Sequence, residues 1–175
     1  MTVALRRLTE VSDTRVQELA ALLIDCVEGG ASVSFMLPLT RERAQAFWQR
    51  VAQSVHNGER ALLVAEDEHG AIVGTVQLVL DQPENQPHRA DVAKMLVHRR
   101  ARRQGLGAQL MCVAEDTARD CGKTLLVLDT VTGGDAERLY TRLGWQRVGS
   151  IPDYALWPQG GLCATTYFYR QVAAT

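Results

Sequence analysis

Hydrophobic residues alternate weakly over residues 3–8 and then recur at helical spacing in the two segments that follow. The first of these segments begins at Asp13, a residue type that often caps helix N-termini. Its apolar stripe consists of Val16, Leu19, Ala20, Leu23 and Val27. A second helix is predicted from Thr40, again as the capping residue, to about His56. The chain therefore opens with a short strand and two amphipathic helices.

Strand-like segments come next. Residues 61–65 and 71–80 are rich in aliphatic and β-branched side chains, and they flank the polar turn 66–70, which ends in glycine. A polar loop with two prolines, over 81–88, leads into a further strand from Arg89 to Val97. These segments predict an antiparallel meander.

The pairing changes in the second half of the chain. A helix follows residue 105, and its apolar stripe consists of Leu106, Leu110, Val113, Ala114 and Ala118. Residues 124–130 then form a nearly unbroken apolar run, which is typical of a strand covered on both faces. Because a helix separates this strand from residues 89–97, the two strands are predicted to run parallel.

A short helix and two strands complete the predicted fold. Asp135 opens the helix over 136–143, and strands are predicted over 145–151 and 162–170. The fold class is therefore α/β, of mixed α+β type, with a mostly antiparallel seven-stranded sheet flanked by about four helices. No linker or repeat interrupts the chain, so we expect one domain over residues 1–175.

Composition narrows the range of functions. The chain is 46% hydrophobic and 22% charged, with a formal net charge of −1, so it has no general basic field for nucleic acid. Residues 1–10 lack the apolar core of a signal peptide, and no apolar run reaches the roughly 18 residues that span a bilayer. The four cysteines form no CxxC pair. We expect a cytoplasmic protein with reduced thiols, no metal site, and no nucleic-acid or membrane partner.

The turn over residues 97–108 carries the most chemical information. Four arginines and two glycines precede a helix N-terminus, where unpaired N–H groups and the helix dipole favour an anion. Glycine at 105 and 107 lets an oxygen approach the backbone closely. No Gly-Lys-Ser/Thr follows, and the third glycine of a dinucleotide fingerprint is missing. The alternatives are a nucleic-acid patch and a solvated face.

Two motifs carry a family resemblance. The first, Arg or Gln followed by x-x-Gly-x-Gly/Ala, consists of Arg102, Gly105 and Gly107. The second, in a strand and short helix, consists of Ala136, Leu139, Tyr140, Gly144 and Trp145. In order and spacing they resemble the GNAT superfamily of acyl-coenzyme A dependent N-acetyltransferases. Within it, the segments 29–36, 128–130 and 148–154 look most like the tabtoxin resistance acetyltransferases.

The resemblance implies acetyl-CoA as co-substrate and a parallel strand pair that splays apart. The backbone of Met95, Leu96 and Val97 would then bind the acetyl carbonyl and the pantetheine arm. The implied pyrophosphate site consists of Arg102, Arg103, Gln104, Gly105, Leu106, Gly107 and Ala108. Many members have an asparagine where this chain has Gly133, so the arm would be held there by backbone or water.

The resemblance also implies catalytic roles. Tyr140 is the candidate acid, because a phenol of pKa about 10 is protonated at neutral pH and can donate to a departing thiolate. Asp91 and Asp129, at the ends of adjacent strands, are the candidate bases for the amine. Core packing for the tyrosine and a strand-end or turn role for the carboxylates are the alternatives. We expect direct transfer in a ternary complex rather than an acyl-cysteine.

The acceptor is expected to be the primary amine of a small, amino-acid-like molecule such as a toxin or antibiotic. Phe35, Asp129 and Tyr154 are the candidate substrate-binding residues. Two other functions stay open: an acyl-CoA-binding sensor, and a basic nucleic-acid-binding module without catalysis. The apolar run over 164–169 is a possible edge for a homodimer.

Overall fold

A seven-stranded sheet forms the core of the computed structural model, which describes residues 2–173. The strands are β1 (Ala4–Leu8), β2 (Arg60–Glu66), β3 (Ile72–Val79), β4 (Arg89–Val97), β5 (Leu125–Val131), β6 (Gln146–Leu156) and β7 (Leu162–Gln171). Their spatial order is β1-β2-β3-β4-β5-β7-β6, and only the β4–β5 pair is parallel. The predicted fold class is therefore confirmed. Of the predicted domain 1–175, positions 1, 174 and 175 lie outside the described residues.

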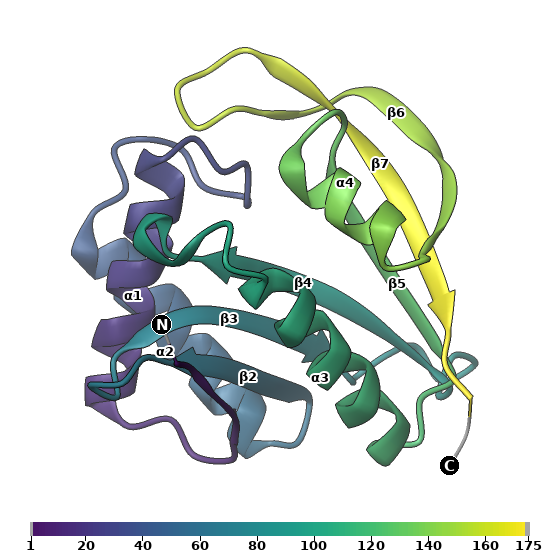
Figure 1. The fold of residues 1–175 in the computed structure, drawn as a ribbon, viewed down its shortest axis with the longest axis horizontal. Helices are drawn as coiled ribbons and strands as arrows, with labels where there is room; N and C mark the ends of the chain where they lie inside the picture. The colour runs from purple at the N-terminus through teal and green to yellow at the C-terminus, as the bar shows by residue number, and fades with distance from the viewer. Residues whose placement is uncertain (1, 174–175) are drawn as a thin grey trace.

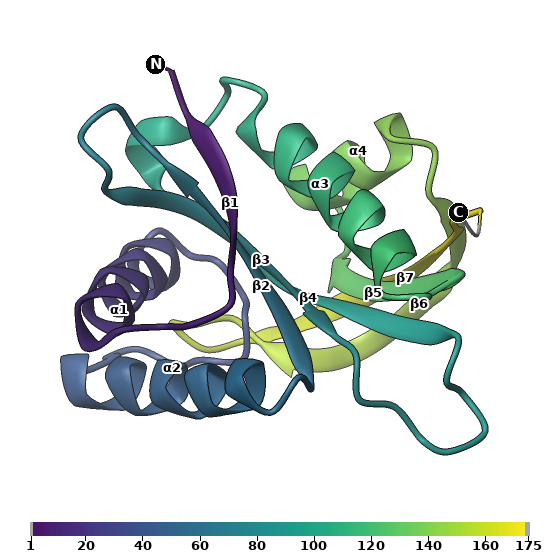
Figure 2. The same cartoon turned by 90° about the horizontal axis from the view of Figure 1, so that it is seen from below.

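Helices cover both faces of this sheet (Figure 2). They are α1 (Asp13–Glu28), α2 (Arg41–His56), α3 (Leu106–Asp120) and α4 (Asp135–Arg142), with a 3₁₀ turn, η1 (Arg99–Ala101). One face carries α1 and α2, and the opposite face carries α3 and α4. The predicted stripe of α1 is buried along its whole length, and Trp48 of α2 packs in the same core. Hydrophobic periodicity thus identified the packed side of α1 and of α3, where Leu106, Leu110, Ala114 and Ala118 are buried.

The N-terminus of α1 corrects one prediction. The cap is Ser12, whose hydroxyl accepts a hydrogen bond from the Arg15 backbone N–H (3.3 Å), and Asp13 is the first helical residue. Thr40 caps α2 as predicted, through a 3.3 Å bond from the Arg43 N–H. Both serine and aspartate suit a cap, so the type of residue alone could not separate two adjacent candidates.

Strands β4 and β5 part soon after they meet, as Figure 1 shows. Their pairing covers only Arg89–Asp91 with Leu125–Val127. Beyond it, β4 has an irregular register against β3, and Lys94 takes a left-handed backbone conformation with φ of 51°. A bulge of this kind bends a strand away from its neighbour. The fold therefore leaves a V-shaped opening in the middle of the sheet.

The carboxyl-terminal strands differ from the prediction in three ways. In β5, Leu126 and Leu128 are buried but Asp129 is exposed, so that strand is not covered equally on its two faces. Strand β7 lies between β5 and β6, so residues 164–169 do not form an edge. Strand β6 is the edge, and it runs past Pro152 to Leu156. Its register against β7 shifts between Ile151 and Ala155, where Asp153 has a φ of 53°, and pairing with β7 resumes at Ala155.

No helix within residues 2–173 is long and apolar enough to cross a membrane. Across the same part of the chain, no three His, Cys, Asp or Glu side chains are grouped as metal ligands would be.

Candidate active site

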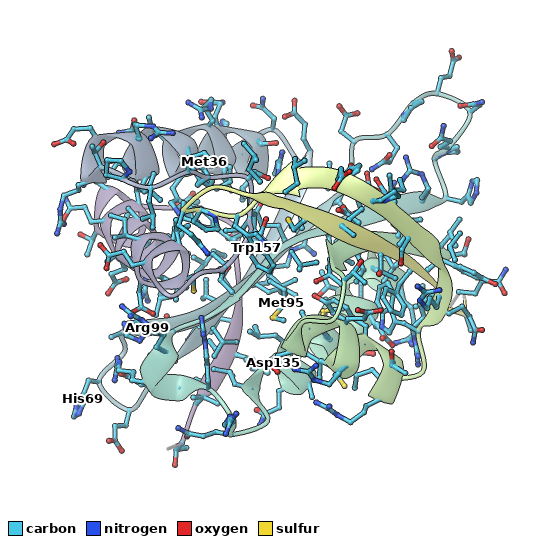
Figure 3. The ribbon with its side chains drawn as sticks, turned by 90° about the horizontal axis from the view of Figure 1, so that it is seen from above. Met36, His69, Met95, Arg99, Asp135 and Trp157 are labelled. Atoms are coloured by element: carbon cyan, nitrogen blue, oxygen red, sulfur yellow. The ribbon has the colours of Figure 1, made fainter. Side chains whose placement is uncertain are left out.

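A cleft of about 930 Å³ opens where β4 and β5 separate. It brings together most of the predicted site: Met95, Leu96, Val97, Arg102, Arg103, Gly105, Leu106, Gly107, Ala108, Asp129 and Tyr140 all line it. Met95, Trp157 and Asp135, which are labelled in Figure 3, line the cleft in the middle of the molecule. Gln104 does not line it, and its amide donates to the Arg100 carbonyl (3.4 Å).

The loop before α3 is shaped to receive an anion. Arg103 and Gly105 have φ of 60° and 76°, and the N-cap of α3, Gly105, has no side chain to occupy the first N–H groups of the helix. Those groups and the positive end of the helix dipole therefore face the cleft. A Cβ at Gly107 would lie 3.0 Å from Leu139 Cδ2, so glycine also keeps this wall closely packed.

Two of the four arginines in the turn are already neutralised. Arg99 donates to Asp25 from its backbone (2.9 Å) and its Nε (2.8 Å), and Arg100 pairs with Asp67 (2.7 Å). Burial opposes ionisation of Asp25, but the hydrogen bonds from Arg99 outweigh it and lower the pKa of that carboxyl. Of the four arginines in the turn, Arg102 and Arg103 line the cleft. The turn is therefore a small anion site held by ion pairs rather than a continuous basic patch.

The β4 backbone offers the cleft a polar edge. Val92, Ala93, Leu96 and Val97 pair with β3, but the ladder with β5 ends at Asp91, so beyond that residue the β5 side of this strand is open to the cleft. The Val97 carbonyl is an exception, because it accepts from Arg102 Nε (3.0 Å) and lies 3.5 Å from Cys26 Sγ. The three residues of the predicted backbone contacts, Met95, Leu96 and Val97, all line the cleft.

Tyr140 is held rigidly at one wall of the cleft. It is 4% exposed, and its ring centroid lies 6.0 Å from those of both Trp145 and Phe168. Burial raises the pKa of Tyr140, and the charge of Asp129 adds to the shift. The phenol therefore stays protonated throughout the physiological range and can only donate a proton there.

The two candidate bases are not equivalent. Asp129 lines the cleft on β5, and its carboxylate accepts from the Thr165 hydroxyl (2.8 Å). Asp91 forms an ion pair with Arg89 and accepts from Gln82 Nε2 (3.2 Å), and it does not line the cleft. The structure brings Asp129, and not Asp91, together with Tyr140.

A second cavity, of about 480 Å³, adjoins the cleft. Lys94 and Asp129 line both spaces. Neither Phe35 nor Tyr154 lines either one. Phe35 instead packs edge-on against Phe47 (5.2 Å between centroids), and Tyr154 hydrogen-bonds the Tyr167 hydroxyl (3.0 Å).

Apart from Asp91 and Asp129, the residues that line the second cavity were missed from the sequence. They include Phe47, Arg60, Lys94 and Tyr167. The hydrogen bond with Tyr154, helped by burial, raises the pKa of Tyr167 to about 12. One signal was present: Lys94 is a cation within the otherwise apolar stretch 92–97, where a charge needs a reason.

Gly133, which stands where many members have asparagine, is tied into α4. Its N–H donates to the Glu137 carboxylate, and its carbonyl accepts from Arg138 Nη1 (3.0 Å). With φ of 80°, it adopts a conformation that glycine tolerates readily. The residue serves the helix start, and it offers no side chain to the cleft.

The antiparallel sheet with one splayed parallel pair and a glycine loop at a helix N-terminus defines the class of protein. A model of the acetyltransferase (GNAT) family matches residues 21–145. The chain therefore belongs to the GNAT acetyltransferase family. It is 29% identical over 163 residues to an uncharacterized N-acetyltransferase from the hisH-hisA intergenic region of Azospirillum brasilense, covering 91% of this chain and 95% of that protein.

Solved structures share the fold over nearly the whole chain. A putative acetyltransferase from Salmonella typhimurium with its cofactor acetyl-CoA has a TM-score of 0.78 at 19% identity, covering 100% of this chain and 96% of that one. A phosphinothricin acetyltransferase from Sinorhizobium meliloti, in complex with AcCoA, has a TM-score of 0.81 at 17% identity, covering 99% and 90%. An N-acetyltransferase from Staphylococcus aureus Mu50 has a TM-score of 0.80 at 15% identity, covering 99% and 100%.

Proposed function

We propose that the protein transfers an acetyl group from acetyl-CoA to the primary amine of a small molecule, within a ternary complex. The observation that carries this proposal is one cleft in which Tyr140 and Asp129 lie between an anion-binding loop and an open strand edge. Family membership supports the reaction class, and the acetyl-CoA complexes of two proteins with this fold support the co-substrate.

The cleft fits the co-substrate chemically. The left-handed loop and the N-terminus of α3 suit the pyrophosphate, with Arg102 and Arg103 beside it. The edge of β4 at Met95, Leu96 and Val97, which has no ladder with β5, suits the amide-containing pantetheine arm. Bound there, acetyl-CoA would supply a thioester carbonyl for attack by the amine.

The residues account for the proton transfers of the reaction. The ammonium of the acceptor gives its proton to Asp129, directly or through water, and the freed amine forms the new C–N bond as the C–S bond breaks. Tyr140 then donates its proton to the departing thiolate. Its raised pKa keeps that proton available at neutral pH. The nitrogen loses its second proton, directly or through water, to the Tyr140 phenolate, which gives the neutral amide and restores the phenol.

Direct transfer is favoured over an acyl-cysteine. Cys26 lines the cleft, but it is buried, and burial raises the pKa of its thiol. A thiol in that form is a poor nucleophile. Cys112 is exposed on α3 and does not line the cleft.

We propose an amino-acid-like acceptor, with toxins of the tabtoxin type as one candidate class. The resemblance of the segments 29–36 and 148–154 supports it, and a 480 Å³ cavity suits a ligand of that size. A role in resistance would follow from such a substrate.

Acetyl transfer is tested by incubating the protein with acetyl-CoA and a panel of amino acids, dipeptides, polyamines and aminoglycosides. Coenzyme A release is followed with a thiol reagent, and the acetylated product is identified by mass spectrometry. Turnover that falls in Tyr140→Phe supports the proposal. Tight acetyl-CoA binding without release from any amine would instead indicate a sensor. Salt-sensitive RNA or DNA binding without acetyl-CoA binding would indicate a nucleic-acid module.

We also propose a homodimer that uses the exposed edge strand β6. Its exposed apolar side chains include Val148, Ile151, Tyr154 and Leu156. Light scattering should give twice the chain mass, and Val148→Asp with Ile151→Asp should give the monomer; a monomeric wild type refutes the homodimer.

A cytoplasmic location is supported by four free cysteines in the described residues.

A further inference from the structure

The second cavity carries more positive charge than its own carboxylates neutralise. Its charged lining consists of Arg60, Arg89, Lys94, Asp91 and Asp129. Three cations face two carboxylates, which leaves one positive charge in excess. The whole chain, in contrast, has a net charge of −1, so the excess is a local property of this cavity.

One of the three cations, Arg89, is bound by other side chains of the protein. Arg89 forms an ion pair with Asp91 and also donates to Gln82 Oε1 (2.6 Å) and Gln86 Oε1 (2.8 Å). Gln82 in turn donates to Asp91 (3.2 Å). Each of the three guanidinium nitrogens of Arg89 therefore already donates to a protein oxygen.

The other two cations have only neutral partners. Arg60 donates to the Gln77 side-chain oxygen (2.7 Å), and Lys94 donates to the Ser34 hydroxyl (3.3 Å). The Lys94 ammonium also lies 5.8 Å from the centre of the Phe47 ring. Among the described residues, neither cation meets a carboxylate at salt-bridge distance.

The surroundings of Arg60 and Lys94 disfavour their charged forms. Burial lowers the pKa of Arg60 and of Lys94, and the charge of Arg60 lowers that of Lys94 further; the charges of Glu59 on Arg60 and of Asp129 on Lys94 offset these effects only in part. Two like charges within electrostatic reach and partly shielded from water repel each other. An anion bound between them would relieve that cost.

We propose that Arg60 and Lys94 form a carboxylate-binding subsite that selects acceptors carrying both an amine and a carboxylate. This inference rests on the proposed acetyl transfer. Lys94 and Asp129 line both the cavity and the cleft, so a carboxylate at the two cations directs the amine toward Asp129. The planar guanidinium of Arg60 can offer two parallel N–H groups to one carboxylate. Gln77, which is fully buried, positions that guanidinium.

The test compares each acid with its own amide. Glycine, β-alanine, 4-aminobutyrate and alanyl-alanine are assayed beside their carboxamides, with acetyl-CoA in excess. We expect the best acid to exceed its amide at least about tenfold in kcat/KM, the scale of one charge-assisted contact. Lys94→Gln and Arg60→Gln should each raise KM for the acid and leave the amide almost unchanged. Arg7→Gln, which removes one charge from an exposed position on β1, is the matched control.

The possible failures can be told apart. Amides used as well as acids by the wild type, or an acid preference that survives both variants, would overturn the subsite while acetyl transfer stands. Calorimetric titration of the same acids and amides into protein saturated with coenzyme A detects the subsite without turnover. If no amine releases coenzyme A, the proposed function fails, and equal binding of acid and amide would then overturn the subsite as well.

Discussion

A charge placed at Gly107 tests the anion-binding loop directly. Gly107 is the second residue of α3, and its backbone is not left-handed, so a side chain brings no conformational strain. A new Cβ would lie 3.0 Å from Leu139 Cδ2 and 3.8 Å from the Met95 thioether. Both neighbours are flexible side-chain ends, which can move by a few tenths of an ångström. Gly107→Gln therefore measures added bulk, and Gly107→Glu adds one negative charge to the same shape.

The difference between the two variants follows from Coulomb's law. A carboxylate about 5 Å from a phosphate costs about 3 kcal/mol at an effective dielectric constant of about 20, and about 1 kcal/mol in water. Because Gly107 is only half-buried, we expect a value between these limits. The Glu variant should thus bind acetyl-CoA about 5-fold to 150-fold more weakly than the Gln variant.

Isothermal titration of acetyl-CoA at about 50 mM and about 500 mM salt measures this difference. Screening should shrink the gap between Glu and Gln at high salt, whereas the effect of bulk should persist. Thermal unfolding of both variants controls for damage to the fold. Equal affinity of the two variants at low salt would show that the phosphates do not lie at this helix end.

Three further predictions concern catalysis, the loop anchor and the core. Tyr140→Phe keeps the ring packing and removes the proton donor, so kcat should fall about 10²-fold to 10⁴-fold with little change in acetyl-CoA affinity by calorimetry; an unchanged kcat contradicts the acid role. Asp25→Asn should cost about 1–3 kcal/mol in urea unfolding at pH 7. Since folding lowers the Asp25 pKa, this stabilisation is present above the unfolded value of about 4 and is lost as pH falls through the folded value; a constant difference down to pH about 2 would refute it. Leu110→Ala, at a fully buried position, should cost about 2–5 kcal/mol in the same assay, and a cost below about 1 kcal/mol would contradict the packing.

Local patterns were enough to predict much of the fold. The α1 stripe at 3.6-residue spacing, the hairpin before β3 and the apolar run of β5 each reflect short-range geometry that the chain displays in order. The glycine loop before α3 was also predictable, because Gly105 and Gly107 adjoin a periodic helix. For the same reason, the residues of the cleft that belong to that loop were identified from sequence alone.

Only the tertiary structure decided which charges are free. Asp25 and Arg99 are 74 residues apart in the chain, so their ion pair could not be seen in the sequence pattern. Likewise, Asp91 and Asp129 look alike at two strand ends, yet Arg89 occupies the first and the cleft receives the second. Lys94 and Arg60 became neighbours through the pairing of β2, β3 and β4. Long-range pairing therefore determined the electrostatics of the site, because charges interact through space and not along the chain.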